Sequence, residues 1–317
     1  MTETVADAGA GSFRDARTVQ VLAQAKVNLR LRILAREASG FHQLETLLLR
    51  LELSDTVRVR RTDSSRSLDI SGDADPAAIG PTDRNLAWRA AVAYCDAAGR
   101  ADGFAIELEK RIPIGGGLGG GSADAGAVLR AMDAMASTPM GEAALLRIAF
   151  TLGADVPFMS SENAYALAWG RGERLLALVP PPRRVVVLLV PSFGVSTKDA
   201  YGWLEGPRSS SMPVGDVTGM LDPATLAQWP EIARLAVNDF EPVVATRHPE
   251  ITALVNVLRE EGCAPAMMSG SGSVVFGVHP AESVGINISH DGPQGTPSMR
   301  GLVTSSAERV EPVVLLD

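Results

Sequence analysis

The sequence predicts an α+β fold built from two domains. At 317 residues, the chain has the length expected of about two domains. Hydrophobic residues make up 46% and charged residues 21% of it, so a sizeable core can form. Segments with alternating apolar side chains follow one another as in hairpins, with helical segments mixed among them. Hairpin-like strands favour an antiparallel sheet with helices beside it over a doubly wound parallel sheet.

Alternation of apolar and polar residues predicts the first strand over residues 19–34. Lys26 and Asn28 are two positions apart on this strand, so their side chains leave the same face. For Lys26 alone, the simplest interpretation is a solvated side chain at the edge of a sheet. A turn is expected at 38–40, and residues 41–53 and 56–60 continue the sheet.

The rest of the first half mixes helices with strands. Apolar residues at helical spacing, such as Leu86, Ala90 and Tyr94, predict a helix that begins near residue 85. Gly153 is expected to end a later helix. The predicted helices cover 85–98, the segment after the glycine-rich stretch 112–126, and 142–152, and the predicted strands cover 104–110, 165–169 and 174–179.

Three consecutive prolines at 180–182 form a rigid connector and mark the domain boundary. We therefore expect an N-terminal domain over 1–178, with 1–17 as a flexible tail, and a C-terminal domain over 179–317. In the second half we expect strands over 185–190, 266–268, 274–278 and 313–316, helices over 232–236 and 251–260, and loops over 206–223 and 285–299.

Composition excludes several classes of protein. The net charge is -8, and no basic block offsets it, which argues against a partner that is a nucleic acid. No apolar run approaches the roughly 18 residues of a spanning helix, and the first 17 residues lack the apolar core of a signal peptide. The two cysteines have no metal-binding spacing, as expected of buried thiols in a reducing compartment. We therefore expect a cytoplasmic protein without a membrane partner.

Lysine is rare among the 29 basic residues, and it occurs at Lys26, Lys110 and Lys198. A coding bias toward Arg explains the scarcity. It does not explain the positions, because Lys26 lies on the first strand and Lys110 ends the strand before the glycine-rich segment. A compact ammonium is not interchangeable with a guanidinium at a site that needs a point charge.

The glycine-rich segment at 115–122, GGGLGGGS, carries the clearest chemical signal. It satisfies GxGxxG formally, but it follows several strands instead of the first one, so the dinucleotide-binding interpretation is weak. It also nearly satisfies the Walker pattern, but Gly121 stands where that pattern needs Lys. A flexible linker is disfavoured, because six glycines in seven positions between a strand and a helix carry a large cost in conformational entropy, which is unexpected without a functional role.

The dinucleotide-binding and Walker patterns share a glycine-rich loop before a helix N-terminus, and this shared feature predicts an anion-binding loop. Glycines let the backbone approach an anion closely, and amides at a helix N-terminus point their hydrogens toward it. Ser122 is placed either as the N-cap of the following helix or as a hydroxyl ligand of a phosphate-bound Mg²⁺.

Three further motifs each allow a structural and a functional interpretation. Asp155 precedes Pro157, which is typical of a helix N-cap, but a carboxylate near a phosphate loop can also act as a general base. Phe41 and His42 can stack on a flat base and bond its edge, although a lone His is more often structural. Residues 269–273, SGSGS, form either a tight hairpin turn or a second anion-facing loop.

Taken in order, these segments resemble a known family. AKVNLRLRIL (25–34), IPIGGGLGGGSADAG (112–126) and MSGSGSVVF (268–276) are similar to the three motifs of the GHMP kinase superfamily. GFHQLET (40–46) and VSTKDAY (195–201) narrow the resemblance to the 4-diphosphocytidyl-2-C-methyl-D-erythritol kinases. The resemblance runs from about residue 21 to 276, and the segment 279–317 is hard to align. It implies a ribosomal protein S5 domain 2-like N-terminal domain, which binds ATP, and a ferredoxin-like C-terminal α/β sandwich, with the site between them.

The resemblance also implies an activity: ATP and Mg²⁺ phosphorylate the 2-hydroxyl of a cytidine diphosphate-linked sugar alcohol in isoprenoid precursor biosynthesis. Asp155 would be the general base and Lys26 its cationic partner. The implied nucleotide-binding residues are Gly115, Gly116, Gly117, Leu118, Gly119, Gly120, Gly121, Ser122, Asn85 and Lys110, with Mg²⁺ reached through Ser122. The implied substrate-binding residues are Asn28, Phe41, His42, Thr197 and Tyr201. The family usually has Tyr where this chain has Phe41. Stacking on the base is kept with Phe, but a hydrogen bond from the hydroxyl is lost.

Two alternative functions are also compatible with the sequence. Another GHMP kinase, of homoserine or mevalonate type, would have a substrate without a base for Phe41 and His42 to hold. A nucleotide-binding module without catalysis is the second alternative, and the presence of Lys26, Ser122 and Asp155 counts against it. The expected assembly is a monomer or a weak homodimer.

Overall fold

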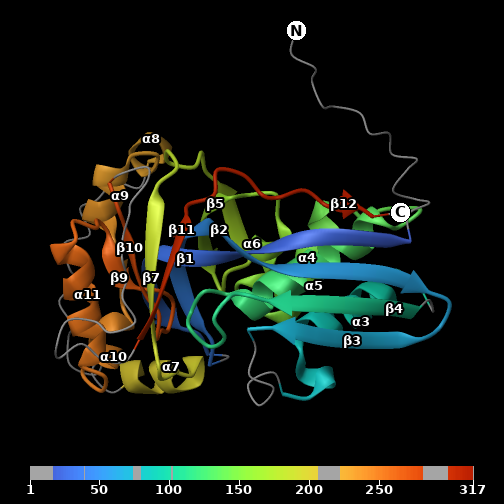
Figure 1. Cartoon of the computed structure of the whole chain (residues 1–317), viewed down its shortest axis with the longest axis horizontal. Helices are drawn as coiled ribbons and strands as arrows, with labels where there is room; N and C mark the ends of the chain where they lie inside the picture. Colours follow the sequence, from blue (N-terminus) through green and yellow to red (C-terminus); the bar gives the residue numbers. More distant parts are fainter. Residues whose placement is uncertain are drawn as a thin grey trace, which may run out of the picture.

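The computed structural model describes residues 17–38, 40–73, 80–100, 103–205, 222–280 and 299–316. Two sheets stand side by side in it, each with helices against one face, as Figure 1 shows. The expected tail 1–17, apart from its last residue, and most of the expected loops 206–223 and 285–299 lie outside the described residues.

The first sheet is built on two long antiparallel strands, β1 (Thr18–Arg36) and β2 (His42–Thr62). The two segments predicted at 41–53 and 56–60 are one strand, β2, because the chain passes 54–55 without leaving the ladder. The described part of this sheet has eight strands, with the path β12-β1-β2-β4-β3 and with β5 and β8 attached to it. Its other strands are β3 (Arg66–Gly72), β4 (Gly103–Lys110), β5 (Tyr165–Gly170), β6 (Arg174–Ala177), β8 (Val237–Asn238) and β12 (Val314–Leu315).

Four helices cover one face of this sheet (Figure 1). They are α3 (Leu86–Ala97), α4 (Gly120–Ala134), α5 (Glu142–Leu152) and α6 (Val156–Ser160). Asn85 caps α3 through its side chain, which accepts a hydrogen bond from the amide of Ala87, and α5 ends at Gly153 as predicted. Most of α4 and all of α6 are buried, so the segments on either side of them are held in fixed positions.

The second sheet has the order β11-β7-β10-β9, and all its neighbours are antiparallel. In chain order this is 4-1-3-2, the order of the ferredoxin-like sandwich that the resemblance implied. Its strands are β7 (Val185–Pro191), β9 (Ala266–Met268), β10 (Val275–Val278) and β11 (Met299–Ser305), and the nearby helices are α7 (Thr197–Glu205), α8 (Pro223–Leu226), α9 (Trp229–Leu235), α10 (Glu241–Ala245) and α11 (Glu250–Glu260).

The two halves of the chain are joined by more than the proline connector. Strands β8 and β12 come from the second half, and both pair with β1 in the first sheet. The prediction identified most elements, including the strand–turn–strand unit at 266–278, but it missed β3, β8, η1 (Thr82–Arg84), α7, α8, α10 and β11. β3 has only two apolar side chains, Leu68 and Ile70, and both are half-buried, so its alternation is shorter than that from which the other strands were predicted.

Candidate active site

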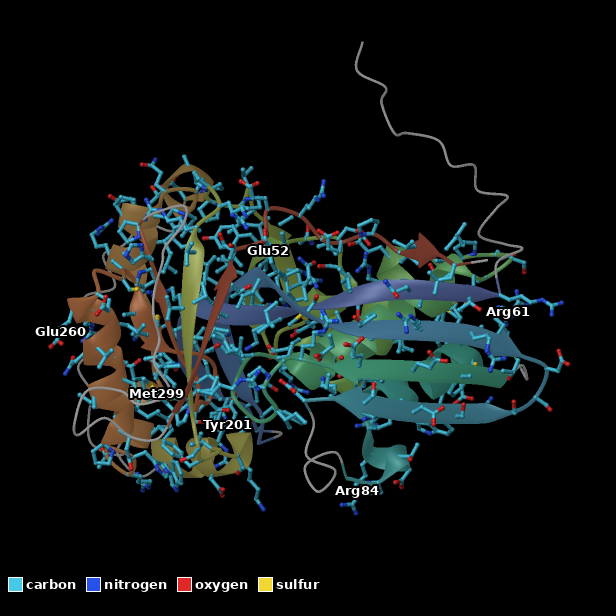
Figure 2. The ribbon with its side chains drawn as sticks, in the orientation of Figure 1. Glu52, Arg61, Arg84, Tyr201, Glu260 and Met299 are labelled. Carbon is cyan, nitrogen blue, oxygen red and sulfur yellow. The ribbon has the colours of Figure 1, made fainter. Side chains whose placement is uncertain are left out.

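A cleft of about 670 Å³ opens between the two sheets. That volume lies in the range of small-molecule sites. Its lining comes from β1, the glycine-rich segment, the start of α6, α7 and the second glycine–serine turn. Figure 2 labels two lining residues from distant segments, Arg84 of η1 and Tyr201 of α7. The cleft brings together the sequence-predicted residues Lys26, Asn28, Asn85, Lys110, Gly115, Gly116, Gly117, Leu118, Gly119, Gly120, Gly121, Ser122, Asp155, Thr197 and Tyr201.

The glycine-rich segment is a rigid loop, not a linker. Gly115, Gly117 and Gly119 all have positive φ, which side-chain-bearing residues rarely adopt. A Cβ on Gly117 would lie 2.1 Å from the carbonyl oxygen of Ser269, in the second glycine–serine turn. The Ser269 hydroxyl also donates to the Gly117 carbonyl at 3.0 Å. The two glycine-containing loops are therefore interlocked, although they are about 150 residues apart in sequence.

The prediction that Ser122 is the N-cap of the following helix is wrong. α4 begins at Gly120, and Gly119 is its N-cap, in the left-handed conformation at φ 72°. Positive φ suits glycine, so the cap falls three residues before Ser122. The first amides of a helix have no partner within the helix, and the residues that carry them here, Gly120, Gly121 and Ser122, line the cleft. An anion in the cleft can be bound by these amides.

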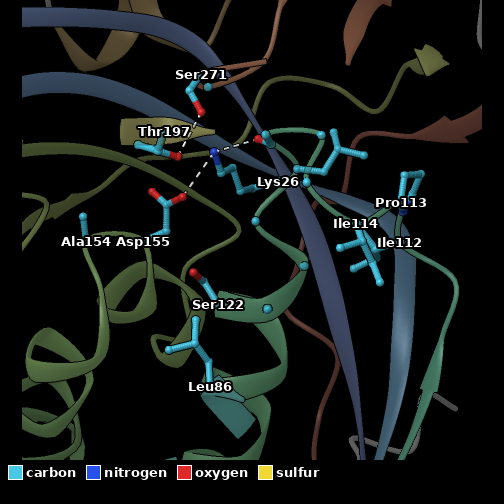
Figure 3. A pocket seen from close by; sticks show the side chains of 18 of the residues that line it. Lys26, Leu86, Ile112, Pro113, Ile114, Ser122, Ala154, Asp155, Thr197 and Ser271 are labelled. Atoms are coloured by element: carbon cyan, nitrogen blue, oxygen red, sulfur yellow. Dashed lines mark hydrogen bonds and ion pairs between the residues drawn. The ribbon is translucent and has the colours of Figure 1, made fainter. Parts of the chain in front are cut away.

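Lys26 lies at the centre of the cleft wall (Figure 3). Its side chain is buried, so the interpretation as a solvated residue at a sheet edge is wrong. The ammonium donates to Asn28 Oδ1 at 2.6 Å and to the Gly117 carbonyl at 3.0 Å, and it lies 3.3 Å from Asp155 Oδ2. One buried cation therefore joins β1, the glycine loop and Asp155.

Asp155 occupies the N-cap position of α6, as predicted, but its side chain makes no capping bond. The carboxylate turns toward Lys26 instead, and 34% of the side chain remains exposed to the cleft. The capping interpretation therefore holds for the backbone and not for the carboxylate. A charged, partly exposed carboxylate held beside an ammonium can accept a proton from a bound hydroxyl.

A buried cluster at the other end of the cleft was not predicted. Lys110 donates to Asp55 Oδ2 and, at 2.6 Å, to Asp124 Oδ2. Asp55 also accepts from the amides of Arg111 and Ile112, whereas Asp124 Oδ1 has no partner among the described residues. Lys110 therefore reaches the cleft with its charge already matched by carboxylates. Lys110 itself was predicted from its place at the end of the strand before the glycine loop, but its partners Asp55 and Asp124 were not.

Two ionisable groups of this cluster have shifted pKa values. Burial, together with the neighbouring Asp55, raises the pKa of Asp124 from 3.8 to about 8, although Lys110 opposes the shift. Burial alone would lower the pKa of Lys110, but the carboxylates of Asp124 and Asp55 outweigh it and raise that pKa. The cluster thus has one ammonium, one carboxylate with several donors and a second carboxyl group that favours its proton.

This assignment predicts a pH dependence of stability that the substitution Asp124→Asn removes. The folded protein holds a proton on Asp124 that the unfolded chain releases near pH 3.8, so the stabilisation is complete below that value and is lost as pH rises to about 8. Between these limits the free energy of unfolding should fall by up to about 1.4 kcal/mol per pH unit from this group. Urea unfolding of wild type and Asp124→Asn from pH 5 to 9 measures it. A difference between the two proteins that does not change with pH would contradict the assignment.

The predicted substrate-binding residues are only partly brought together. Thr197 and Tyr201 line the cleft from α7, and the Thr197 hydroxyl lies 3.1 Å from that of Ser271, in the second glycine–serine turn. His42 stacks on the Tyr201 ring with centroids 4.7 Å apart, but it is not itself among the described lining residues. Phe41 is also outside the lining. It is 58% exposed, and the Arg171 guanidinium lies over its ring at 4.3 Å.

Among the described residues, no helix has both the length and the apolar character that crossing a membrane requires.

Family models and curated proteins match most of the chain. The family model for the GHMP kinases N terminal domain matches residues 85–167, and that for the GHMP kinases C terminal matches residues 224–290. The 4-diphosphocytidyl-2-C-methyl-D-erythritol kinase of Citrifermentans bemidjiense is 36% identical over 267 residues, which cover 84% of this chain and 91% of that protein. The protein of the same name from Moorella thermoacetica is 38% identical over 81% of this chain and 88% of its own length.

Solved structures show the same fold. A crystal structure of 4-(cytidine 5'-diphospho)-2C-methyl-D-erythritol kinase superposes with a TM-score of 0.67 at 32% identity, over 90% of this chain and 98% of that one. Homoserine kinase from Cytophaga hutchinsonii reaches a TM-score of 0.68, over 100% of this chain and 99% of that one, at 18% identity, so it shows the fold alone. The two-domain α+β fold is confirmed. By its sequence and its fold, the chain belongs to the 4-diphosphocytidyl-2-C-methyl-D-erythritol kinases of the GHMP kinase superfamily.

Proposed function

We propose that this chain transfers the γ-phosphoryl group of ATP to the 2-hydroxyl of 4-diphosphocytidyl-2-C-methyl-D-erythritol, in the methylerythritol phosphate route to isoprenoid precursors. The observation that carries the proposal is the Lys26–Asp155 ion pair beside the glycine loop. It occurs in a chain that is 36% identical, over most of its length, to a kinase named for this substrate.

In the proposed reaction Asp155 is the general base. Its carboxylate accepts the proton of the acceptor hydroxyl while that oxygen forms a bond to the γ-phosphorus. The bond between the γ-phosphorus and the bridging oxygen breaks, and ADP leaves. The Lys26 ammonium lies 3.3 Å from the carboxylate and balances the negative charge that develops at the reacting oxygens. Phosphoryl transfer depends mainly on such positioning and charge neutralisation.

The glycine loop and the start of α4 are proposed to hold the triphosphate through backbone amides. Asn85 and Lys110 belong to the same end of the cleft, where Ile70, Leu86 and Leu108 supply an apolar wall for the adenine. These features support ATP as the phosphoryl donor.

Magnesium is proposed to bind with the nucleotide. In the part of the chain that the structure describes, no group of three or more His, Cys, Asp or Glu side chains is placed to hold a metal. Mg²⁺ in phosphoryl-transfer sites is bound mainly by substrate phosphates with few protein ligands, and the half-buried Ser122, whose hydroxyl lines the cleft at the glycine loop, fits that donor set. When bound, the ion neutralises charge on the phosphates.

The cytidine end of the substrate is proposed to bind near α7, where Tyr201, Thr197 and Asn28 line the cleft. Asn28 is held in one orientation, because its amide donates to Thr46, whose hydroxyl donates to the Arg30 carbonyl. His42 and Phe41 are assigned to base recognition by the family resemblance. In the structure His42 stacks on the Tyr201 ring, which lines the cleft, and is not itself among the lining residues. A cytoplasmic location is part of the proposal, and the buried thiols of Cys95 and Cys263 fit a reducing compartment.

The substitution His42→Ala is expected to raise KM for the cytidine-linked substrate by about tenfold, with KM for ATP unchanged. The reason is loss of the ring that stacks on Tyr201. The matched control is His248→Ala, because His248 also stacks on an aromatic ring, that of Phe193, away from the cleft lining. Steady-state kinetics with each substrate varied in turn measures both constants. Equal increases in the two KM values would contradict the assignment to the cytidine end.

A substrate panel at fixed Mg-ATP tests the proposed function as a whole. We expect phosphorylation of the cytidine-linked compound, and none of homoserine or mevalonate. Turnover of homoserine or mevalonate would favour another kinase of the superfamily, and nucleotide binding without turnover of any of these compounds would favour a non-catalytic module.

A further inference from the structure

Arg50 is one of the largest fully buried side chains among the described residues, and it contacts main-chain carbonyls in place of a carboxylate. It lies on β2. Its Nη2 donates to the carbonyls of Phe158 at 2.8 Å and Ser161 at 3.1 Å, and its Nε donates to that of Asn163 at 3.0 Å. The guanidinium also lies over the Phe158 ring, 5.0 Å from its centroid. These acceptors form the C-terminal end of α6 and the residues just after it.

Arg50 is also the direct cross-strand partner of Lys26. Side chains at paired positions of neighbouring antiparallel strands leave the same face of a sheet, so the two cations are neighbours under α6. Lys26 contacts the carboxylate of Asp155 at the N-terminal end of α6, and Arg50 donates to carbonyls at the C-terminal end. α6 has five residues, a length of about 7 Å, so both ends of this short helix are fixed by one pair of positions in the sheet.

The remaining side of α6 leaves little room for movement. A Cβ on Gly126 of α4 would lie 2.4 Å from the Met159 carbonyl oxygen, so the two helices are in close backbone contact. A Cβ on Gly119 would lie 2.8 Å from Met159 Cε. α6 is thus pressed against the helix that begins at the glycine loop, and a shift of its C-terminal end would move Asp155 relative to that loop.

The buried charge of Arg50 does not suit a role in stability alone, because its hydrogen bonds go to carbonyls and not to a carboxylate. Burial, with repulsion from Arg130, lowers the pKa of Arg50 to about 9, so the guanidinium stays charged at neutral pH in an unfavourable place. The nearby Glu162 is 3.1 Å from Arg130 and pairs with it. A buried ion is weak evidence for stability, because an apolar residue of similar size often stabilises a core as well or better.

We propose that Arg50 is a positioning residue for the reaction: it fixes the C-terminal end of α6 against β2, so that Asp155 at the other end stays beside Lys26 and the glycine loop. The proposal rests on the proposed role of Asp155 as general base. The side chain touches neither substrate nor the reacting atoms, and it acts through α6.

The test compares Arg50→Met and Arg50→Lys with Arg130→Gln as the matched control. Arg130 is another nearly buried arginine, and it donates to the Glu311 carbonyl instead of to carbonyls of α6. We expect Arg50→Met to lower kcat by about 100-fold while both KM values stay within about threefold, since loss of base alignment acts on the reaction step. Arg50→Lys, which keeps a charge and donors, should recover at least about tenfold of that loss. Arg130→Gln should lose stability but keep kcat.

Amide hydrogen exchange of residues 156–161 supplies a readout that does not depend on turnover. Exchange in this segment should be faster in Arg50→Met, relative to the most protected amides of the same protein, and not in Arg130→Gln. An unchanged kcat in folded Arg50→Met would overturn the proposal. So would failure of both Arg50 variants to fold while Arg130→Gln folds, because Arg50 would then serve the fold as a whole. Absence of activity in the wild type, or full activity in Asp155→Asn, would instead contradict the proposed function.

Discussion

Replacement of Asp155 by Asn is expected to lower kcat by about 10³-fold and to leave KM for ATP within about threefold. Asn has nearly the same shape, but its amide cannot accept the proton of the acceptor hydroxyl. The side chain is only partly buried and makes no capping bond to α6, so little stability should be lost. Steady-state kinetics with the cytidine-linked substrate, together with nucleotide binding by calorimetry, measures both effects.

A matched control for this variant exists in the second half of the chain. Asp222 is also a helix N-cap followed by proline, but its carboxylate accepts from the amides of Ala224 and Thr225. Asp222→Asn should therefore reduce stability slightly and leave kcat unchanged. If Asp155→Asn keeps its turnover, Asp155 is not the base. If Asp222→Asn loses as much turnover as Asp155→Asn, the loss cannot be assigned to proton transfer.

The second large effect is expected for Gly117→Ala. A methyl group there would lie 2.1 Å from the Ser269 carbonyl oxygen, and the backbone at φ 80° already disfavours a side chain. The two interlocked loops would have to separate, which also displaces the Gly117 carbonyl from the Lys26 ammonium. We expect affinity for ATP to fall by more than about tenfold, and the free energy of unfolding to fall by about 2 kcal/mol or more.

Gly115→Ala separates the steric effect from the conformational one. Gly115 has a similar φ of 74°, but a Cβ there would meet nothing within 4 Å among the described atoms. This variant should lose only about 1 kcal/mol of stability, from its backbone conformation. Thermal unfolding and nucleotide titration of the two variants measure the contrast. Equal losses in both would show that the contact between the loops contributes nothing.

The parts of the site that could be predicted from the sequence are those whose chemistry is local. Six glycines before a helix indicate an anion-binding loop wherever the chain folds around them. The two-residue spacing of Lys26 and Asn28 places them on one strand face, and the structure joins them at 2.6 Å. The assignment of Asp155 and Lys26 as partners came from the family resemblance, because nothing local connects positions so far apart.

What could not be predicted depends on tertiary contacts between distant segments. Asp55, Lys110 and Asp124 lie on a strand, at a strand end and in a helix, and only the packing of β2, β4 and α4 makes them a cluster. Arg50 appears in the sequence as one arginine among many, and only the packing of α6 against β2 shows that it is buried and bonded to carbonyls. The N-cap of α4 is Gly119 and not Ser122, because a glycine in the left-handed conformation can begin a helix without a capping side chain.

If this chain phosphorylates the 2-hydroxyl of a cytidine-linked substrate with Asp155 as the base, formation of the product should depend on the Asp155 carboxylate. The most direct measurement follows γ-labelled ATP with the purified wild type and Asp155→Asn, and locates the phosphate in the product by ³¹P NMR. We predict one new phosphomonoester, on the 2-oxygen of the erythritol group, formed by the wild type and about 10³-fold more slowly by the variant. A folded wild type that forms no such product, or that forms it no faster than Asp155→Asn, would contradict the claim.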